Sequence, residues 1–280
     1  MTRGPQRRTR RGLVAAVLAL GIAGTATGTP FASAADQPAA DQAAEAANQA
    51  AEAANRPAAA ADRTVDATIE VTGVFDGAGG RFIAGGALGD GGQSESQDAM
   101  FELADGATLS NVTLGAPAAD GVHCVGSCTL RDVIWEDVGE DAATFRGTGA
   151  TVLVDGGSAA KGTDKVFQDN RLAGGSVTIR NFRVSDFGKL YRSCGNCKAQ
   201  AARTVTIQNV TATAPGKVLA GVNVNLGDTV TLSDITITGS GADKVHVCDL
   251  FNGNDTGDEP TKVGTEPDGK ACVASGITVE

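Results

Sequence analysis

The chain has 280 residues, of which 4% are aromatic and 38 are glycine, and its formal net charge is −10. This composition is typical of a soluble, turn-rich protein with one sizeable domain. The negative charge argues against nucleic acid as a partner.

The first 34 residues have the pattern of a secretory signal peptide. A basic start, an apolar run and a small-residue ASA site follow one another in MTRGPQRRTRRGLVAAVLALGIAGTATGTPFASA, the order that such signals share. The Arg10-Arg11 pair is compatible with twin-arginine export. We therefore expect cleavage after Ala34 and a secreted, extracellular mature protein. No later apolar run is long enough to span a membrane.

Residues 35–64 form an Ala-rich segment with scattered Gln, Glu, Asn and Asp. Its helix propensity is high, but no apolar stripe is wide enough to dock on a core. The composition predicts a partly helical spacer, followed by the folded domain over residues 65–280.

A short motif recurs through the folded domain, in which an apolar residue and any residue precede Asn or Asp. The Asn or Asp positions are Asn111, Asp132, Asp155, Asn181, Asn209 and Asp234. Successive positions are 21, 23, 26, 28 and 25 residues apart. Such near-constant spacing, with Gly-rich turns between short strands, predicts a solenoid whose coils bury their inward side chains against each other.

Within the repeats, SVTIRNFRV and TVTIQNVTAT alternate apolar with polar residues, as strands with one buried face require. The helix-forming half of a leucine-rich repeat is missing. We therefore predict an all-β, right-handed parallel β-helix in a single domain. A β-sandwich, which also has short strands at regular spacing, is the alternative.

Six cysteines follow the signal, and an even number in an exported protein favours disulfides. They are Cys124, Cys128, Cys194, Cys197, Cys248 and Cys272. Three sequential bridges are the simplest connectivity. A zinc site and a redox pair are the alternatives for the two short pairs, but each pair lies in a Gly- or Asn-containing turn and no histidine pair accompanies it.

Charged residues keep nearly the same offset from the repeat positions. Asp120, Asp141, Lys165 and Lys189 follow a repeat position by nine, nine, ten and eight residues. Residues of equal phase stack in a solenoid, about 4.8 Å apart. The sequence therefore predicts one column of two acids and two lysines, flanked by Glu140 and Arg192. For any one of these charges alone, ordinary solvation of the surface is the competing interpretation.

Two or three carboxylates with no histidine nearby favour a hard cation such as calcium, and cations in line with them suit an anionic sugar. In a polyuronate, the substrate carboxylate opposes removal of the C5 proton. Calcium and the protein cations would offset that charge, so that a lysine or arginine takes the proton and the C4-linked sugar leaves by β-elimination.

Several longer stretches carry a family resemblance. They are GDGGQSESQDAMFEL, DGVHCVGSCTLRDVIWEDVGEDAATF, DKVFQ, FGKLYRSCGNC, NGNDTG and EPDGKAC. Together they resemble the small, calcium-dependent pectate lyases of polysaccharide lyase family 3, from about residue 66 to 280. The resemblance implies a right-handed parallel β-helix that cleaves polygalacturonate by elimination with calcium as cofactor.

The resemblance also implies roles for individual residues. It makes Asp120, Glu140 and Asp141 the calcium ligands, Lys165, Lys189 and Arg192 the catalytic and substrate-binding cations, and Glu95 a further substrate-binding candidate. Lys165 and Arg192 are the two candidates for the base, and either predicts an alkaline rate optimum. Adjacent residues on a flat strand face opposite ways, so Glu140 and Asp141 share a metal only if the chain bends near Gly139.

Other conspicuous side chains receive no catalytic role. Tyr191 is expected to pack inside, and the lone His123 and His246 are expected to be structural. Trp135 either packs in the core or forms the floor of a sugar subsite. Basic residues on later coils, such as Arg203, either extend the sugar groove or belong to the ordinary surface.

Two other classes of function fit parts of the sequence. A glycoside hydrolase on the same solenoid would use the acids as a catalytic pair without calcium. A non-catalytic, polysaccharide-binding β-helix would explain export and repeats but not the in-phase cations. We expect a monomer that acts on polygalacturonate, with no nucleic acid partner and no membrane partner after signal removal.

Overall fold

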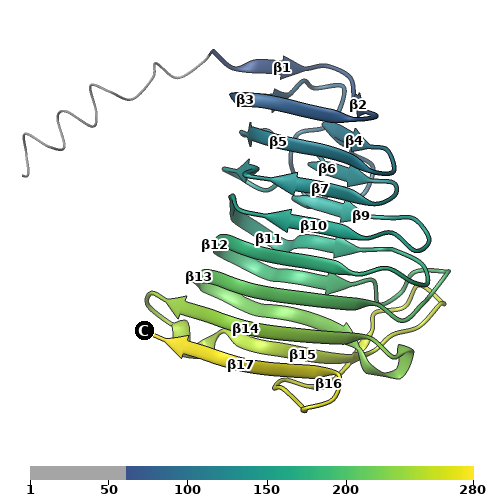
Figure 1. The fold of residues 1–280 in the computed structure, drawn as a ribbon, viewed down its shortest axis with the longest axis vertical. Coiled ribbons are helices and arrows are strands. Elements are labelled where there is room, and N and C mark those ends of the chain that lie inside the picture. Colours follow the sequence, from purple (N-terminus) through teal and green to yellow (C-terminus); the bar gives the residue numbers. More distant parts are fainter. Residues whose placement is uncertain (1–60) are drawn as a thin grey trace, which may run out of the picture. The chain divides into compact units, whose positions relative to one another are not determined.

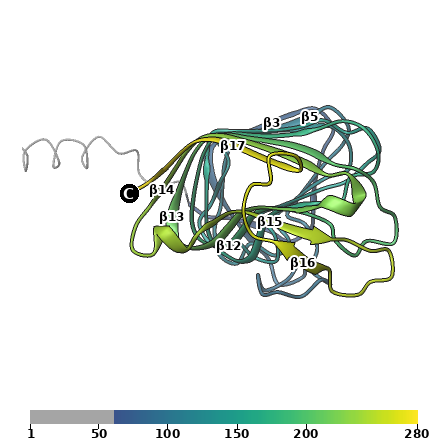
Figure 2. The ribbon, with the colours of Figure 1, turned by 90° about the horizontal axis from the view of Figure 1, so that it is seen from below.

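The computed structural model describes residues 61–280, in which strands stack as successive coils along one axis (Figure 1). A view along that axis shows the strands surrounding a common interior (Figure 2). The expected signal peptide and all but the last four residues of the expected spacer lie outside the described residues. The first strand begins at Arg63.

Residues 61–280 hold 17 strands, two 3₁₀-helices and no α-helix. The strands are β1 (Arg63–Val65), β2 (Ile69–Val71), β3 (Val74–Ala84), β4 (Phe101–Leu103), β5 (Ala107–Leu114), β6 (Val122–Cys124), β7 (Cys128–Arg131), β8 (Ile134–Trp135), β9 (Ala143–Phe145), β10 (Val152–Asp155), β11 (Ser158–Asp169), β12 (Val177–Ser193), β13 (Thr204–Asn223), β14 (Thr229–Thr238), β15 (His246–Asn252), β16 (Thr261–Gly264) and β17 (Cys272–Val279). The 3₁₀-helices are η1 (Val224–Leu226) and η2 (Ala242–Lys244).

The coils form three parallel sheets around the interior. Sheet 1 contains β7, β10 and the first halves of β3, β5, β12, β13, β14 and β17. Sheet 2 contains β1, β8 and the later parts of β3, β5, β12, β13, β14 and β17, with the start of β11. Sheet 3 contains β2, β4, β6, β9, β15 and the last parts of β11, β12 and β13. The prediction of a parallel β-helix is confirmed, and the β-sandwich alternative is wrong.

The repeated Asn or Asp marks the corner between sheets 1 and 2. Asn111, Asp132, Asn181, Asn209 and Asp234 all have φ between 50° and 55°. This left-handed conformation suits Asn and Asp better than other residues with a side chain. A single left-handed residue resets the inward and outward alternation of the strand, so each coil turns from one sheet into the next at this point.

Asp155 departs from this pattern by one position. It pairs with Arg180, which precedes the corner residue Asn181, and Gly156 takes the corner with φ 77°. The expectation that every repeated Asn or Asp has the same phase is therefore wrong at this coil. Asp155 still joins the corner ladder, because its Oδ1 accepts a hydrogen bond from Asn181 Nδ2 at 2.7 Å, and Asn181 Oδ1 accepts one from Asn209 Nδ2 at 2.8 Å.

The interior is filled by the inward apolar side chains of all three sheets. At its centre, the ring of Trp135 lies edge-on to Phe167 at 5.9 Å and to Phe182 at 6.4 Å. Trp135 is only 1% exposed, so it is a core residue and not the floor of a sugar subsite. Tyr191 is also fully buried, as expected.

All three predicted disulfides are present. The bridges are Cys124–Cys128, Cys194–Cys197 and Cys248–Cys272. The first two close tight turns directly after sheet 3, where β6 and β12 end. The third joins β15 to β17, so it ties sheet 3 to sheet 1 at the last coil.

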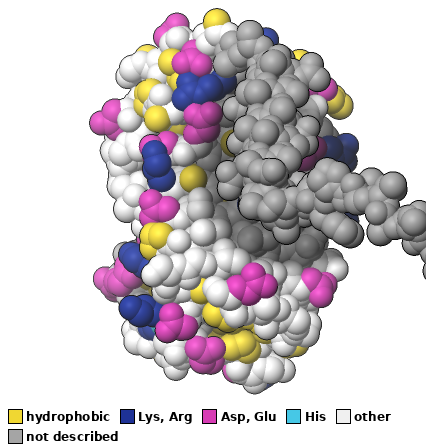
Figure 3. Space-filling model, turned by 90° about the vertical axis from the view of Figure 1, so that its left-hand side faces the viewer, with side chains coloured by type: hydrophobic (Ala, Val, Ile, Leu, Met, Phe, Trp, Pro, Cys, Tyr) yellow, Lys and Arg dark blue, Asp and Glu magenta, His cyan; other side chains and the backbone are white. Residues whose placement is uncertain are grey.

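Acidic and basic side chains are interspersed over the face drawn in Figure 3, with only scattered hydrophobic ones. Ion pairs also link exposed residues of successive coils, such as Arg180 to Asp155 at 2.7 Å and Lys161 to Asp137 at 2.8 Å. These pairs lie on the outer surface, where charged side chains interact with solvent. Within residues 61–280, no helix has the length and apolar character needed to cross a membrane.

The corner ladder predicts different costs for two substitutions at Asn181. Asn181→Gly keeps access to a positive φ but loses two side-chain hydrogen bonds, at a cost of about 1 kcal/mol. Asn181→Ala also places a Cβ in the left-handed region and should cost about 1 kcal/mol more. Denaturant unfolding at constant m-value measures both, and equal midpoints for the two variants would contradict the importance of the corner conformation.

Candidate active site

Sheet 3 carries the predicted charged column. Lys165 and Lys189 are register partners on β11 and β12. The pairing of β9 with β11 continues to Asp141 beside Lys165, and the pairing of β6 with β9 continues to Asp120 beside Asp141. The one-position displacement of Asp155 accounts for one residue of the difference between the offsets of ten and eight, and a one-residue shift in register between residues 162 and 165 accounts for the other. Two acids and two lysines therefore follow one another across four coils, as predicted.

A second column lies three residues further along the same coils, and sequence reasoning found only one of its members. His123 pairs with Thr144, Thr144 with Gln168, and Gln168 with Arg192. Each follows a residue of the first column by three positions. This common offset of three residues in the sequence could have identified the other three members of the column.

The three predicted metal ligands come together at the upper end of these columns. One carboxylate oxygen from each of Asp120, Glu140 and Asp141 lies within 4.8 Å of the others. The chain bends at Glu140, before β9 begins. A Cβ at Gly139 would lie 2.0 Å from the Ala119 carbonyl oxygen, so glycine allows the close backbone approach that turns both carboxylates to one side.

The acidic cluster is electrostatically strained. Burial raises the pKa of Asp141 well above its usual value and raises that of Glu140, although Lys165 opposes both shifts. Oδ1 of Asp120 and Oδ1 of Asp141 are buried and have no hydrogen-bond donor among residues 61–280. Buried carboxylate oxygens without a donor are costly, so the cluster is suited to a cation.

Lys165 lies between the acids and the other cations. Its Nζ is 3.3 Å from Glu140, 3.6 Å from Asp141 and 3.0 Å from Asp164. Burial lowers the pKa of Lys165, but the surrounding carboxylates outweigh burial and raise it above its ordinary value. Asp164 also accepts a hydrogen bond from Lys189, so it links the two lysines. Sequence analysis missed this role of Asp164.

Arg192 has a different environment, because its partners are neutral. It is 6% exposed, and its guanidinium lies over the ring of Phe251, 4.1 Å from the ring centre. Nη1 donates to the Ser193 carbonyl at 2.6 Å and to Asn223 Oδ1 at 3.0 Å. Burial lowers the pKa of Arg192 to about 10.

Two adjoining cavities connect these groups into a groove. The first, of about 300 Å³, contains the acidic cluster, and the second, of about 290 Å³, contains Lys189 and Arg192. Glu95, Lys165 and Gln168 line both cavities. The structure thus brings all seven predicted site residues to one groove, with Glu95 near its middle.

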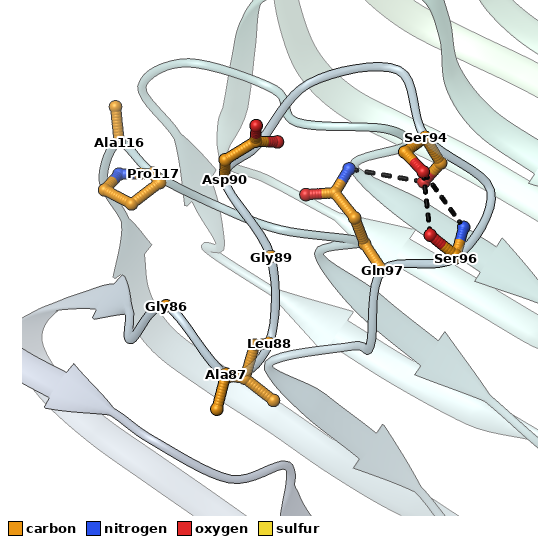
Figure 4. Close-up of a pocket in the computed structure, with 10 residues that line it drawn as sticks. All are labelled: Gly86, Ala87, Leu88, Gly89, Asp90, Ser94, Ser96, Gln97, Ala116 and Pro117. Carbon is orange, nitrogen blue, oxygen red and sulfur yellow. Dashed lines mark hydrogen bonds between the residues drawn. The ribbon is translucent and has the colours of Figure 1, made fainter.

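A larger hollow of about 850 Å³ lies beside the loop that carries Glu95 (Figure 4). Among residues 61–280, Asp90 is the one charged residue that lines it. Gln97 holds the loop by accepting from the Gly91 amide at 2.7 Å and donating to the Gly92 carbonyl at 2.6 Å. This hollow lacks the clustered charges of the smaller cavities, so we place the site in the groove.

Two other residues have partners that the sequence did not predict. His123, expected to be structural, has its Nε2 2.7 Å from Asp120 Oδ2 in a hydrogen bond, so it contacts the acidic cluster. Arg203 is 2% exposed and donates to the Arg171 carbonyl at 2.9 Å inside the solenoid. It therefore cannot extend the sugar groove. His246 lies on the last coils and hydrogen-bonds Asp249 at 2.9 Å.

Similarity to known proteins identifies the family of this chain. The family model described as pectate lyase matches residues 53–258. The chain belongs to the pectate lyase family. Probable pectate lyase D of Neosartorya fischeri is 44% identical over 209 residues, which cover 73% of this chain and 83% of that protein. Probable pectate lyase E of the same fungus is 45% identical over 213 residues, 75% of this chain and 80% of that protein.

Solved structures of pectate lyases have the same fold. The catalytic domain of pectate lyase PelI from Erwinia chrysanthemi matches with a TM-score of 0.67 and 31% identity, over 79% of this chain and all of that chain. PelI in complex with tetragalacturonic acid matches with a TM-score of 0.63 and 30% identity, over 79% of this chain and 72% of that chain. The predicted family resemblance is confirmed.

Because the buried acids are strained, we expect the Asp141→Asn variant to be more stable than the parent when both proteins are free of metal. Because the pKa of Asp141 is raised on folding, the folded state binds more protons than the unfolded state above pH 4, and stability falls as pH rises towards the folded pKa. In chelator at pH 8, Asp141→Asn should raise Tm by about 2–4 °C, the effect of ~1 kcal/mol in a domain of this size.

Asp137→Asn is the matched control, because Asp137 makes an exposed ion pair with Lys161 and should change Tm little. Calorimetry between pH 5 and 9 measures all three proteins. A Tm for Asp141→Asn below that of the parent throughout this range would contradict the strain.

Proposed function

We propose that the protein is a secreted pectate lyase that cleaves α-1,4-polygalacturonate by calcium-assisted β-elimination. The observation that carries the proposal is a single groove that joins a buried carboxylate cluster to Lys165, Lys189 and Arg192. Membership of the pectate lyase family supports the reaction, and the relative in complex with tetragalacturonic acid supports the substrate.

The acidic cluster fits calcium. Its three residues offer carboxylate oxygens, which hard divalent cations prefer, and Oδ1 of Asp120 and Oδ1 of Asp141 have no hydrogen-bond donor among the described residues. We assign the ion to Asp120, Glu140 and Asp141. When bound, calcium would offset the charge of a substrate carboxylate and so acidify the adjacent C5 hydrogen.

The protein cations bind and orient the sugar acid. Lys165 and Lys189 lie in one column at the spacing of adjacent strands, so both can hold carboxylates of the polymer as it crosses the coils. Asp164 lies between their ammonium groups and keeps both charged side chains ordered in the absence of substrate. A strongly negative protein thus presents positive charge locally to a polyanion.

We assign the base to Arg192. Among residues 61–280 it forms no salt bridge, and its pKa is lowered to about 10, whereas Lys165 contacts three carboxylates. Arg192 takes the C5 proton, and the electrons of that bond form the C4–C5 double bond. The C4–O bond breaks at the same time, and the departing oxygen takes a proton from water.

The proposed reaction predicts a specific optical signal. Only elimination leaves a C4–C5 double bond conjugated with the carboxylate, so ultraviolet absorbance should rise when the protein meets polygalacturonate and calcium at alkaline pH. Excess chelator should abolish the rise, and calcium should restore it. New reducing ends without the absorbance would indicate a hydrolase, and neither signal would leave a binding protein; either result would contradict the proposal.

The assignment of the base predicts a pH profile. With a base of pKa about 10, kcat/KM should rise about tenfold per pH unit below that value, since only the deprotonated form reacts. Arg192→Ala should lower kcat by a factor of about 10²–10⁴. Lys165→Ala should act mainly on KM. A Lys165→Ala variant that loses the pH dependence, with Arg192→Ala retaining it, would move the base to Lys165.

Export and monomeric state complete the proposal. The support for export is the basic, apolar and small-residue order of residues 1–34, together with three disulfides, which form in oxidising compartments. N-terminal sequencing of the protein from culture medium should begin at Ala35, and its elution volume in gel filtration should be that of a single chain. Retention of the protein in the cell would contradict this.

A further inference from the structure

The Arg192 side chain is confined on two sides. A Cβ at Gly221 would lie 2.8 Å from Arg192 Cδ and 3.3 Å from the Phe251 ring, so the glycine on the next coil leaves the space that the arginine crosses. A Cβ at Gly195 would lie 2.3 Å from Arg192 Nη2. Phe251 attracts the cation through its ring face, but it gives the guanidinium no hydrogen-bond acceptor.

The acceptors that hold Arg192 are all uncharged. Nη1 donates to the carbonyls of Ser193 and Gly221 at 2.6 Å and 3.4 Å, and to the Asn223 amide oxygen at 3.0 Å. Of these acceptors only Asn223 uses a side chain. The contact is notable because a carboxylate is the usual partner of a buried arginine.

The orientation of the Asn223 amide is fixed by its other partners. Asn223 Nδ2 donates to Asp228 Oδ2 at 3.0 Å and to the Cys194 carbonyl at 3.0 Å. Both partners are acceptors, so they require the amide nitrogen on their side and leave the oxygen for Arg192. Asp228 Oδ2 also accepts from the Asn223 backbone amide at 2.8 Å, and Asp228 is 1% exposed.

We propose that Asn223, oriented by Asp228, is the positioning residue of Arg192. Its neutral amide oxygen holds the guanidinium, and its side chain lies between the guanidinium and the carboxylate of Asp228. This inference rests on the proposed function, in which Arg192 is the base. The neutrality of Asn223 matters in this inference, because an Asp at the same place would make the same contact but would favour the protonated arginine.

Several charged groups surround Arg192, so the distance between its guanidinium and the Asp228 carboxylate is important. Titratable or charged groups that act on Arg192 or line its cavity are Glu95, Asp164, Lys165, Lys189, Tyr191, Arg203, Asp228, Glu259 and, across the Phe251 ring, Lys262. Burial lowers the pKa of Arg192, and Asp228 is the largest opposing influence. Moving the Asp228 charge into direct contact would therefore raise that pKa.

A charge-swap variant tests the proposal. In Asn223→Asp/Asp228→Asn the net charge and the number of carboxylates are unchanged, but the carboxylate contacts Arg192 directly. NMR titration of arginine labelled at Cζ, with the Arg192 signal assigned by its absence in Arg192→Lys, measures the pKa of Arg192 without substrate. We expect the swap to raise that pKa by about one unit or more, and an unchanged titration would overturn the proposal.

Kinetics on polygalacturonate give a second readout. For the swap, the pH profile of kcat/KM should move upward, and the rate at pH 8.5 should fall about tenfold for each unit of the shift. Asn223→Ala, which removes the acceptor without adding charge, should lower kcat about tenfold or more and change KM less than about twofold. If the variants lose kcat and thermal stability together while the pH profile of kcat/KM does not move, Asn223 is a structural residue and the proposal is overturned.

Asn209→Asp is the matched control. Asn209 lies in the corner ladder, where Asp132 and Asp234 occupy equivalent positions, so the same chemical change should leave activity and the Arg192 titration unaltered. Thermal unfolding checks that each variant is folded. Failure of both the swap and Asn223→Ala to fold would show that the pair serves stability, which would also overturn the proposal.

The two proposals fail in different ways. If the parent protein makes no unsaturated product, the proposed function fails, and the NMR titration still decides whether Asn223 controls the state of Arg192. If the parent is active and the swap titrates and reacts like it, the inference fails and the function stands.

Discussion

The site depends on the register between successive coils of sheet 3. Parallel pairing stacks residues of equal phase, at the ~4.8 Å spacing of hydrogen-bonded strands, so side chains more than 20 residues apart become neighbours. Lys165 faces Lys189, and Gln168 faces Arg192, through one continuous pairing of β11 with β12. A slip of one residue would remove every one of these side chains from the groove.

The same register sorts the charges along the groove. The upper coils concentrate buried carboxylates whose pKa values are raised, and the lower coils concentrate cations. Lys165 stands at the boundary and contacts acids of its own and the preceding coil. In the proposed function, this order would give a metal ion and a polyanionic chain separate but adjoining positions, although the protein as a whole is acidic.

Arg192 shows how a solenoid can shape the chemistry of one side chain. Small residues on neighbouring turns, Gly195 and Gly221, leave it space, and an aromatic ring from β15 covers it. Its hydrogen-bond acceptors are neutral, while the buried carboxylate of Asp228 is engaged by Asn223. Burial without a charged partner favours the neutral form of a base.

Much of this could be predicted because a repeat converts sequence spacing into spatial position. The spacing predicted the column of Asp120, Asp141, Lys165 and Lys189, and it made three sequential disulfides the simplest connectivity. The one-residue offset of Asp155 could not be foreseen, since Gly156 takes over the left-handed corner without altering the motif.

Other contacts depend on turns whose geometry no repeat specifies. Asn223 and Asp228 flank the 3₁₀-helix η1, and their contact with Arg192 requires the path of that turn. His123 was expected to be structural because it is a lone histidine beside a cysteine, and nothing in the repeat pattern pointed to its hydrogen bond with Asp120. Arg203 was expected either in the sugar groove or on the ordinary surface, since charged side chains rarely lie inside. It lies in the interior instead, where its Nε donates to the Arg171 carbonyl.

The central claim is that one groove on sheet 3 holds calcium and a galacturonate chain beside Arg192. A crystal structure of the Arg192→Ala variant with calcium and tetragalacturonate tests it most directly. The account predicts anomalous density for calcium between Asp120, Glu140 and Asp141, with sugar carboxylates against Lys165 and Lys189 and a C5 hydrogen facing the space left by Arg192. Calcium bound elsewhere, or a sugar chain outside this groove, would contradict it.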